Sequence, residues 1–309
     1  MPGARTHRAD LDATPYYHCV SRCVRRAFLC GKDPYTGRDF EHRKEWVESR
    51  LLFLARVFAM EVQAYAVMSN HLHVVVRVDR DRAENWSDAE VVRRYGRLFG
   101  QPKASLEMLS ARQRKDRIAQ WRERLWDLSW MMRCLNESIA RRANEEDECT
   151  GRFWEGRFRC QPLLDEPALV ACMAYVDLNP LRAGASSSAE NAAFTSMRKR
   201  LEGTEVPAGL APFSDQVPKG SRRTTVPMTF DEYRALLRWT ARRAKHTDAR
   251  APSAVSVMGL SAPAFADAMS IDGLRAFCAL GSVAHLDELA ASRGTKWVRG
   301  KGPAERLFR

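Results

Sequence analysis

The feature that most constrains the fold is a pair of apolar runs on either side of Ser69-Asn70. The first run, EVQAYAVM, occupies 61–68, and the second, HLHVVVRV, occupies 71–78. A short polar pair between two runs of β-forming residues is typical of a hairpin turn. Because side chains alternate along a strand, we expect His71 and His73 to share one face of the sheet.

Two imidazoles on one face beside a turn are suited to binding a metal ion. The pattern alone equally fits two structural histidines whose ring nitrogens are satisfied by hydrogen bonds, because this stretch offers no third ligand. The hairpin therefore leaves both interpretations open.

The elements around the hairpin alternate between strands and helices. The predicted elements, in order, are a strand at 14–24, a helix within 41–60, the hairpin, helices between 87 and 147, a strand within 151–164 and a helix at 166–179. Val47, Leu51 and Leu54 at helical spacing predict the first helix. This order predicts an α+β domain built on an antiparallel sheet.

The helix predicted at 166–179 carries a second group of polar residues. Asp165 is a suitable N-cap, and Pro167 suits the first turn. Tyr175 and Asn179 lie one turn apart at the edge of the apolar stripe, so both can face the sheet. Taken alone, Tyr175 fits an ordinary residue at the edge of the core.

Three sequence motifs resemble one family. VMSNHLHVVV resembles the His-hydrophobic-His (HUH) signature of the tyrosine transposases that act on single-stranded DNA. GRFWEGRF and AYVDLNPLRAG are similar to the later motifs of the REP-associated branch of that family. The motifs occur in the family's order, and the resemblance covers roughly residues 10–185.

The resemblance implies a ferredoxin-like antiparallel sheet, the HUH nuclease domain, with a metal-dependent site. His71 and His73 would bind Mg²⁺ or Mn²⁺, and Asn179 would be a third ligand. Tyr175 would attack a DNA phosphate and leave a 5′-phosphotyrosine and a free 3′-OH. A phenol is a weak nucleophile at neutral pH, so a cation that neutralises charge in the transition state is required. Tyr95 is the rival nucleophile.

The charge of the chain favours a polyanionic partner. The formal net charge is +12, and clustered Lys and Arg bind phosphates by releasing counterions. Arg157 and Arg159 alternate with Phe158 and Cys160 and form a basic face of the strand predicted within 151–164. Arg141 and Arg142 are adjacent on a predicted helix. We expect these four arginines to bind single-stranded or hairpin DNA, although each also fits a solvated surface.

The composition divides the chain into a larger and a smaller part. Residues 1–202 form the predicted catalytic domain, with a basic helical insertion at about 101–128. Residues 203–227, rich in Pro, Gly and Ser, are predicted to be a linker. Residues 228–309 are predicted to form a smaller, basic, helical C-terminal module, and we expect the chain after residue 203 to raise DNA affinity without supplying chemistry.

The cysteines and the apolar runs predict a cytoplasmic protein without a membrane span. The eight cysteines show no Cys-x-x-Cys pair and fall in apolar patterns, as buried reduced thiols do. No apolar run approaches the ~20 residues that a membrane helix needs. Members of the family that the motifs resemble include monomers and homodimers, so both states are open.

Three functional hypotheses remain, in decreasing order of support. The first is a metal-dependent tyrosine transposase that nicks and rejoins single-stranded DNA at hairpin-forming palindromes. The second is a non-catalytic relative that binds a DNA or RNA hairpin with the same surface. The third is a His-x-His metal hydrolase of small substrates, which would need acidic ligands after the histidines, where VVVRV stands instead.

Overall fold

A computed structural model describes residues 11–24, 30–32, 37–100, 106–221, 223–243, 251–269, 274 and 277–308. Within these residues, the chain folds around a four-stranded antiparallel sheet with strand order β2-β3-β1-β4. The strands are β1 (Tyr16–Arg22), β2 (Met60–Val67), β3 (His71–Val78) and β4 (Arg159–Leu163). With α1 (Arg43–Val57) between β1 and β2, this is the ferredoxin-like order. The predicted α+β class is confirmed.

The β2–β3 hairpin forms where the sequence predicts it. The backbone N–H of Met68 donates to the carbonyl of His71 at 2.9 Å and closes the turn. Leu72, Val74 and the other even-numbered residues of β3 face one core, whereas His73 and Val75 face the opposite side. The alternation of side chains therefore separates an apolar face of β3 from the face that carries the histidines.

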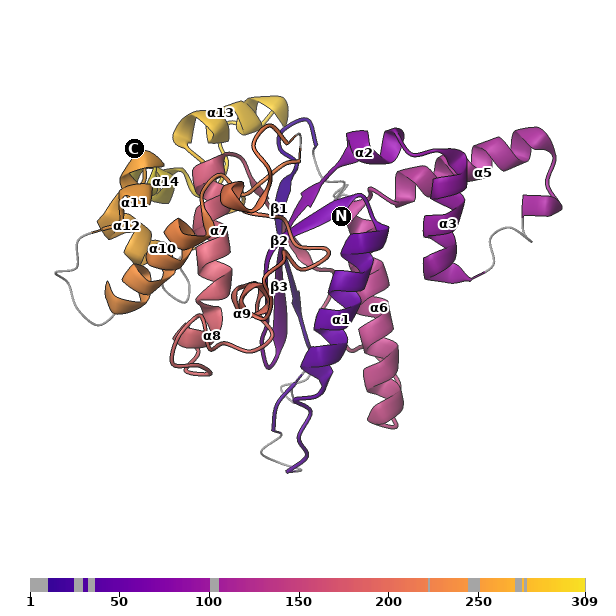
Figure 1. The fold of residues 1–309 in the computed structure, drawn as a ribbon, viewed down its shortest axis with the longest axis horizontal. Coiled ribbons are helices and arrows are strands. Elements are labelled where there is room, and N and C mark those ends of the chain that lie inside the picture. The colour runs from indigo at the N-terminus through magenta and orange to yellow at the C-terminus, as the bar shows by residue number, and fades with distance from the viewer. Residues whose placement is uncertain are drawn as a thin grey trace.

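Helices cover both faces of the sheet (Figure 1). One face packs against α1 and α6 (Leu128–Glu146), with α2 (Arg80–Glu84), α3 (Asp88–Phe99) and α5 (Ala111–Arg124) beyond them. The side chain of Ser87 accepts a hydrogen bond from Glu90 N, which caps α3 as its sequence predicts. Asp127 caps α6 in the same way.

The other face packs against α7 (Glu166–Asp177). Asp165 caps this helix by accepting from Ala168 N at 2.8 Å. The helix predicted at 166–179 ends earlier, at Asp177, and a short helix α8 (Asn179–Arg182) follows. Pro180 explains the break, because proline has no N–H to continue the hydrogen-bond ladder of α7. The break places Asn179 in the first turn of a new helix.

Segment 203–227, predicted to be a linker, packs against the edge of the sheet. Val62 N donates to Gly209 O at 3.1 Å, and Ala211 N donates to Val62 O at 2.8 Å. Phe213 and Val226 are fully buried. The segment thus covers the outer edge of β2, which otherwise would present unpaired backbone groups. The predicted domain limits stay a prediction, and residues 1–10, 101–105 and 244–250 of those ranges lie outside the described residues.

The C-terminal part is helical, as predicted, and shares a core with α7. Its elements are α10 (Phe230–Arg243), α11 (Ser253–Val257), α12 (Ala262–Ala268), α13 (Val283–Ser292) and α14 (Lys301–Leu307), and α9 (Ser196–Leu201) and η1 (Ser214–Gln216) precede them in the chain. In Figure 1, α10, α11, α12 and α14 stand beside α7, on the side away from α1 and α6, and α13 lies above α7. Throughout the described ranges, no helix is both long and apolar enough to cross a membrane.

Candidate active site on the sheet face

Three histidines meet on the sheet face that α7 covers. His71 and His73 lie on β3 with ring centroids 4.7 Å apart. His18 lies on β1, and its ring is nearly parallel to that of His73, at an interplanar angle of 15°. His73 is 3% exposed and His18 is 5% exposed, whereas His71 is partly exposed at the end of the hairpin. The structure thus places His71 and His73 on one face and adds His18 between β3 and β4.

Hydrogen bonds connect His18 to both sides. His18 Nε2 lies 2.9 Å from His73 Nδ1, and His18 Nδ1 lies 3.2 Å from Gln161 Oε1. Gln161 Nε2 donates to the carbonyls of Phe277 at 3.1 Å and Leu274 at 3.3 Å. Burial lowers the pKa of His18 from its usual value to about 4, against a smaller upward effect of the Gln161 hydrogen bond. His18 is therefore neutral at pH 7.

The donors around His71 and His73 fit a divalent cation. Asn179 Nδ2 lies 3.0 Å from His73 Nε2, and a 180° rotation of the amide would put Oδ1 at that position. His71 Nδ1 lies 2.6 Å from Asn70 Oδ1, and with this amide orientation His71 donates from Nδ1 and has its lone pair on Nε2.

The ligand set that results contains no carboxylate. Across the described part of the chain, no group of three or more His, Cys, Asp or Glu side chains is arranged to hold a metal ion. A site here would consist of His71, His73 and the amide of Asn179. Such a set leaves coordination positions for phosphate oxygens and water. The metal itself, Mg²⁺ or Mn²⁺, stays a prediction.

Tyr175 lies beside the histidines. Its ring centroid is 5.9 Å from that of His73 and 6.3 Å from that of His18, in both cases edge to face. The residue is only 2% exposed. The predicted nucleophile and the predicted ligands, which are about a hundred positions apart in the sequence, are thus brought together. Tyr95 is not part of this group, because it stacks on Trp121 at 4.4 Å in the core on the other face.

Arg182 is the cation next to Tyr175. Its guanidinium carbon lies 4.3 Å from the centre of the Tyr175 ring, and its Nη2 donates to the Tyr175 carbonyl. Burial lowers the pKa of Arg182 to about 10, while the interaction with the Tyr175 side chain raises it. Among the residues that the structure describes, the buried Nη1 has no hydrogen-bond partner. A guanidinium in this position stabilises negative charge on the phenol oxygen.

No protein family and no curated protein matches this sequence. One solved structure is similar. It is described as the structure of a REP-associated tyrosine transposase bound to a REP hairpin, with 11% sequence identity and a TM-score of 0.40. The match covers 73% of this chain and 100% of that chain. At this level the similarity assigns no residue and no activity to the present chain.

The predicted arginines separate into two groups. Arg159 pairs with Val20 across β4 and β1, and Val20 pairs in turn with His73, so Arg159 is on the histidine face. Arg157 is exposed just before β4. Arg141 and Arg142 lie on α6, which packs against the other face. The structure brings Arg159 near the site and keeps the α6 pair away from it.

The sequence analysis missed His18, Gln161, Arg182 and Arg22. Arg22 pairs directly with His71 and therefore shares its face. The alternation of His18, Val20 and Arg22 in the first predicted strand contained this information, but only the register between β1 and β3 connects it to His71. Arg182 lies within the AYVDLNPLRAG motif, where its spacing from Tyr175 was a usable signal.

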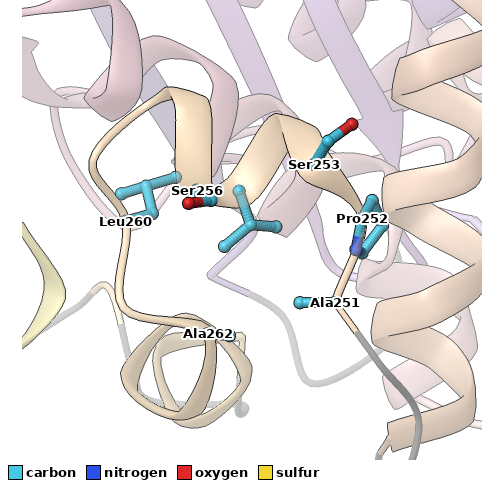
Figure 2. A pocket seen from close by; sticks show the side chains of 7 residues that line it. Ala251, Pro252, Ser253, Ser256, Leu260 and Ala262 are labelled. Carbon is cyan, nitrogen blue, oxygen red and sulfur yellow. The ribbon is translucent and has the colours of Figure 1, made fainter.

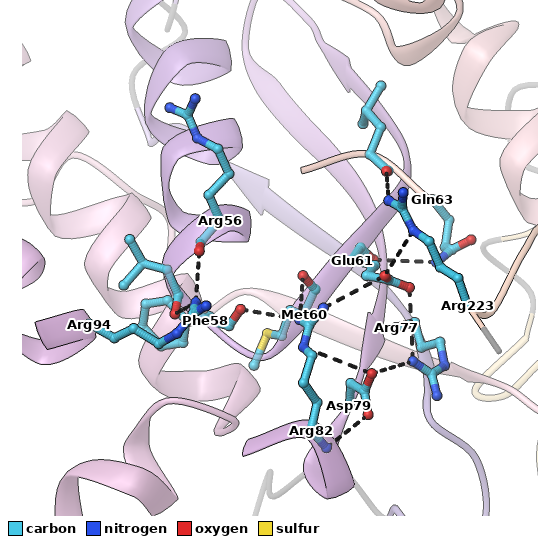
Figure 3. Close-up of polar contacts among 12 residues, drawn as sticks. Arg56, Phe58, Met60, Glu61, Gln63, Arg77, Asp79, Arg82, Arg94 and Arg223 are labelled. Carbon is cyan, nitrogen blue, oxygen red and sulfur yellow. Dashed lines mark hydrogen bonds and ion pairs between the residues drawn. The ribbon is translucent and has the colours of Figure 1, made fainter. Parts of the chain in front are cut away.

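A cluster of charges lies at the far end of the same hairpin (Figure 3). Glu61 lies 3.7 Å from Arg82, 3.9 Å from Arg77 and 4.0 Å from Arg223. Arg77 also pairs with Asp79 at 2.9 Å. These arginines contact carboxylates of the chain itself. They lie near the end of β3 opposite to His71, so they do not belong to the histidine site.

A hollow of about 540 Å³ lies in the C-terminal part, at α11 and the start of α12 (Figure 2). Its lining residues are Ala251, Pro252, Ser253, Val255, Ser256, Leu260 and Ala262. The polar side chains in this set are two serines, and none of the lining residues is titratable. The hollow therefore lacks the groups that acid-base or metal chemistry needs.

Proposed function

We propose that the protein is a metal-dependent enzyme that nicks and rejoins single-stranded DNA at hairpin-forming repeats, through a 5′-phosphotyrosine intermediate. The proposal is supported by the position of His73 between two residues. The ring centroid of Tyr175 is 5.9 Å from that of His73, and Asn179 Nδ2 is 3.0 Å from His73 Nε2. A phenol, two same-face imidazoles and an amide in one place are the groups that phosphoryl transfer to tyrosine requires.

In this mechanism the Tyr175 oxygen attacks the phosphorus of the scissile phosphodiester. The P–O3′ bond breaks, the phosphate stays on the tyrosine, and the proton of the phenol ends on the 3′ oxygen that leaves. Arg182 stabilises the negative charge that develops on the phenol oxygen. The cation held by His71, His73 and Asn179 would polarise the phosphate and neutralise its charge. Rejoining is the reverse reaction, with a 3′-OH as the nucleophile.

Two arginines would hold the strand at the open side of the site. Arg22 and Arg159 share the histidine face, and Arg159 is exposed. Guanidinium groups bind phosphates with paired hydrogen bonds. We assign Arg22 and Arg159 to backbone phosphates flanking the scissile bond, and Arg157 to the approach.

The test is formation of a covalent adduct. A 3′-labelled hairpin oligonucleotide incubated with the protein and Mn²⁺ should give a labelled protein band that resists denaturation. Tyr175→Phe should reduce this band to background, because only the nucleophilic oxygen is lost. Tyr95→Phe is the matched control, since it removes a phenol oxygen from the other core and should leave the band unchanged.

The same two variants can contradict the proposal. A band of undiminished intensity from Tyr175→Phe moves the nucleophile elsewhere, and loss of the band in Tyr95→Phe would identify the rival. In the wild type the adduct should map to the peptide ACMAYVDLNPLR, residues 171–182.

A second candidate function is non-catalytic binding of a DNA or RNA hairpin. The 2% exposure of Tyr175 favours it, because a phosphate reaches the phenol only if surrounding groups move. This hypothesis predicts hairpin binding by wild type without any covalent band at saturating Mn²⁺. Detection of the band excludes it.

A further inference from the structure

We propose that His18 is a positioning residue for His73: it fixes the tautomer and the ring plane of His73 so that the lone pair of Nε2 faces Asn179, and it is itself held by backbone carbonyls of the C-terminal part through Gln161. The hydrogen-bonded geometry carries this inference. Its link to metal binding rests on the proposed function.

The donors and acceptors can be assigned from one end of the network. Gln161 Nε2 lies 3.1 Å from Phe277 O and 3.3 Å from Leu274 O, and both carbonyls can only accept. The amide is therefore oriented with its NH₂ group toward these carbonyls. Its oxygen then faces His18 Nδ1 at 3.2 Å, so Nδ1 of His18 carries the proton.

The second step follows from the first. A neutral imidazole with its proton on Nδ1 has its lone pair on Nε2. His18 Nε2 lies 2.9 Å from His73 Nδ1, so His73 must donate there. His73 in turn has its lone pair on Nε2, the atom 3.0 Å from the Asn179 amide. The tautomer of each residue thus determines that of the next. The last one leaves the lone pair of His73 on Nε2, the atom that would bind a metal.

An imidazole ligand usually donates its second N–H to a neighbouring acceptor, which orients the ring and raises its basicity. Here the acceptor is another imidazole. The two rings are nearly parallel, at 15°, and the facing nitrogens are 2.9 Å apart, which is within hydrogen-bond distance. Because His18 and His73 are both buried, water does not replace this bond when one partner is removed.

The network ends on carbonyls that precede a segment paired with the sheet. Leu280 N donates to Pro162 O at 2.9 Å, and Leu164 N donates to Leu280 O at 2.8 Å, so the chain after Phe277 runs along β4. The carbonyl of Phe277, one of the two that accept from Gln161, thus lies three residues before the point where the chain pairs with β4. We expected the C-terminal part to raise DNA affinity without supplying chemistry. In this proposal it also orients Gln161, and through it His18, in the histidine site.

The experiment measures the His73 tautomer in the metal-free protein by ¹⁵N NMR of the imidazole nitrogens. Wild type should show the proton on Nδ1 of His73. His18→Leu removes the acceptor and should give a mixture of tautomers. His18→Gln, whose amide oxygen can accept near the position of Nε2, should restore the Nδ1–H form. Gln161→Leu is a second variant, which leaves both histidines intact. It should lower the fraction of His73 that has its proton on Nδ1, but by less than His18→Leu does.

Calorimetric titration of Mn²⁺ without DNA provides the second measurement. His18→Leu should weaken Mn²⁺ binding by about 10- to 100-fold, and His18→Gln should recover most of the affinity. Tyr17→Phe is the matched control, because it removes a buried hydrogen bond from the same strand on the opposite face and should not change Mn²⁺ affinity.

The outcomes separate the two proposals. His73 with its proton on Nε2 in wild type, or an unchanged tautomer in both His18→Leu and Gln161→Leu, overturns the positioning role. A wild type that shows the expected tautomer but binds no Mn²⁺ overturns the metal site and leaves the positioning of His73 intact. Weaker Mn²⁺ binding in Tyr17→Phe that equals the loss in His18→Leu would show a general loss of stability and would also overturn the inference.

Discussion

At the scale of single residues, a half-buried arginine lies over the ring of Tyr175. The guanidinium of Arg182 is 4.3 Å from the ring centre, and burial lowers its pKa to about 10, which still leaves it charged at neutral pH. A desolvated cation next to a phenol oxygen is electrostatically stronger than one in water. If Tyr175 is the nucleophile, as we propose, this cation would supply the charge stabilisation that an isolated tyrosine lacks.

We predict that Arg182→Leu slows formation of the covalent adduct by roughly 10²- to 10³-fold, the usual effect of losing one charge-stabilising donor. Arg182→Lys, which keeps the charge but not the planar group, should recover part of the rate. Mn²⁺ affinity should stay unchanged in both variants, since Arg182 is not among the metal ligands. Single-turnover rates on the hairpin substrate would measure this, and equal rates for Leu and Lys variants would contradict a role for the charge.

Some residues of the histidine site can be located from local sequence patterns, whereas others depend on how the strands pair. His71 and His73 follow from alternation within one strand, and Tyr175 and Asn179 follow from one helical turn, so local periodicity was sufficient. His18 and Gln161 depend on the register between β1, β3 and β4, which no local pattern gives. Arg141 and Arg142 were assigned from charge alone, and charge does not say which face of the sheet a helix covers.

At the scale of elements, the position of α7 depends on a buried carboxylate at its last residue. Asp177 is 1% exposed and accepts hydrogen bonds from Ser196 Oγ at 2.7 Å, Met197 N at 3.1 Å and Tyr233 Oη at 2.7 Å. It therefore joins α7 to α9 and α10. Burial raises the pKa of Asp177, with the three hydrogen bonds acting in the opposite direction.

This shift gives a prediction for stability against pH. A carboxyl whose pKa is raised on folding favours the folded state most below its usual pKa of 3.8, and this contribution is lost as pH rises through the higher folded-state pKa. Relative to Asp177→Asn, which does not titrate, wild type should therefore lose free energy of unfolding as pH rises above 3.8. Urea unfolding of both proteins across this range measures the difference. A difference that grows in favour of wild type with rising pH would contradict burial as the main cause.

At the scale of the whole molecule, the C-terminal part shares a core with the half that carries the histidines. Leu236, Leu237, Leu280 and Leu286 belong to the same core cluster as the residues of α7. Burial of apolar surface is the main favourable contribution to folding, so this shared core stabilises both parts together. Removing the segment after residue 203 would expose α7, so truncation is a poor way to test whether its charges bind DNA.

Substitutions of single arginines test which side of the sheet binds DNA. Arg22 and Arg159 share the histidine face, whereas Arg141, 78% exposed in its side chain, lies on α6 beyond the opposite face. If DNA binds across the histidine face, Arg22→Gln and Arg159→Gln should each reduce the slope of log affinity against log salt by about 1.

Arg141→Gln is the matched control for this last prediction, because it removes the same charge from the other layer and should leave the slope unchanged. Hairpin affinity would be measured by fluorescence anisotropy with Tyr175→Phe as the background, so that cleavage does not alter the ligand. The effect of the formal net charge of +12 on DNA affinity would then depend on where the charged residues lie. A slope that falls equally in all three variants would mean that DNA binds the protein without preference for either face, and a fall in Arg141→Gln alone would place the DNA on the layer formed by α1 and α6.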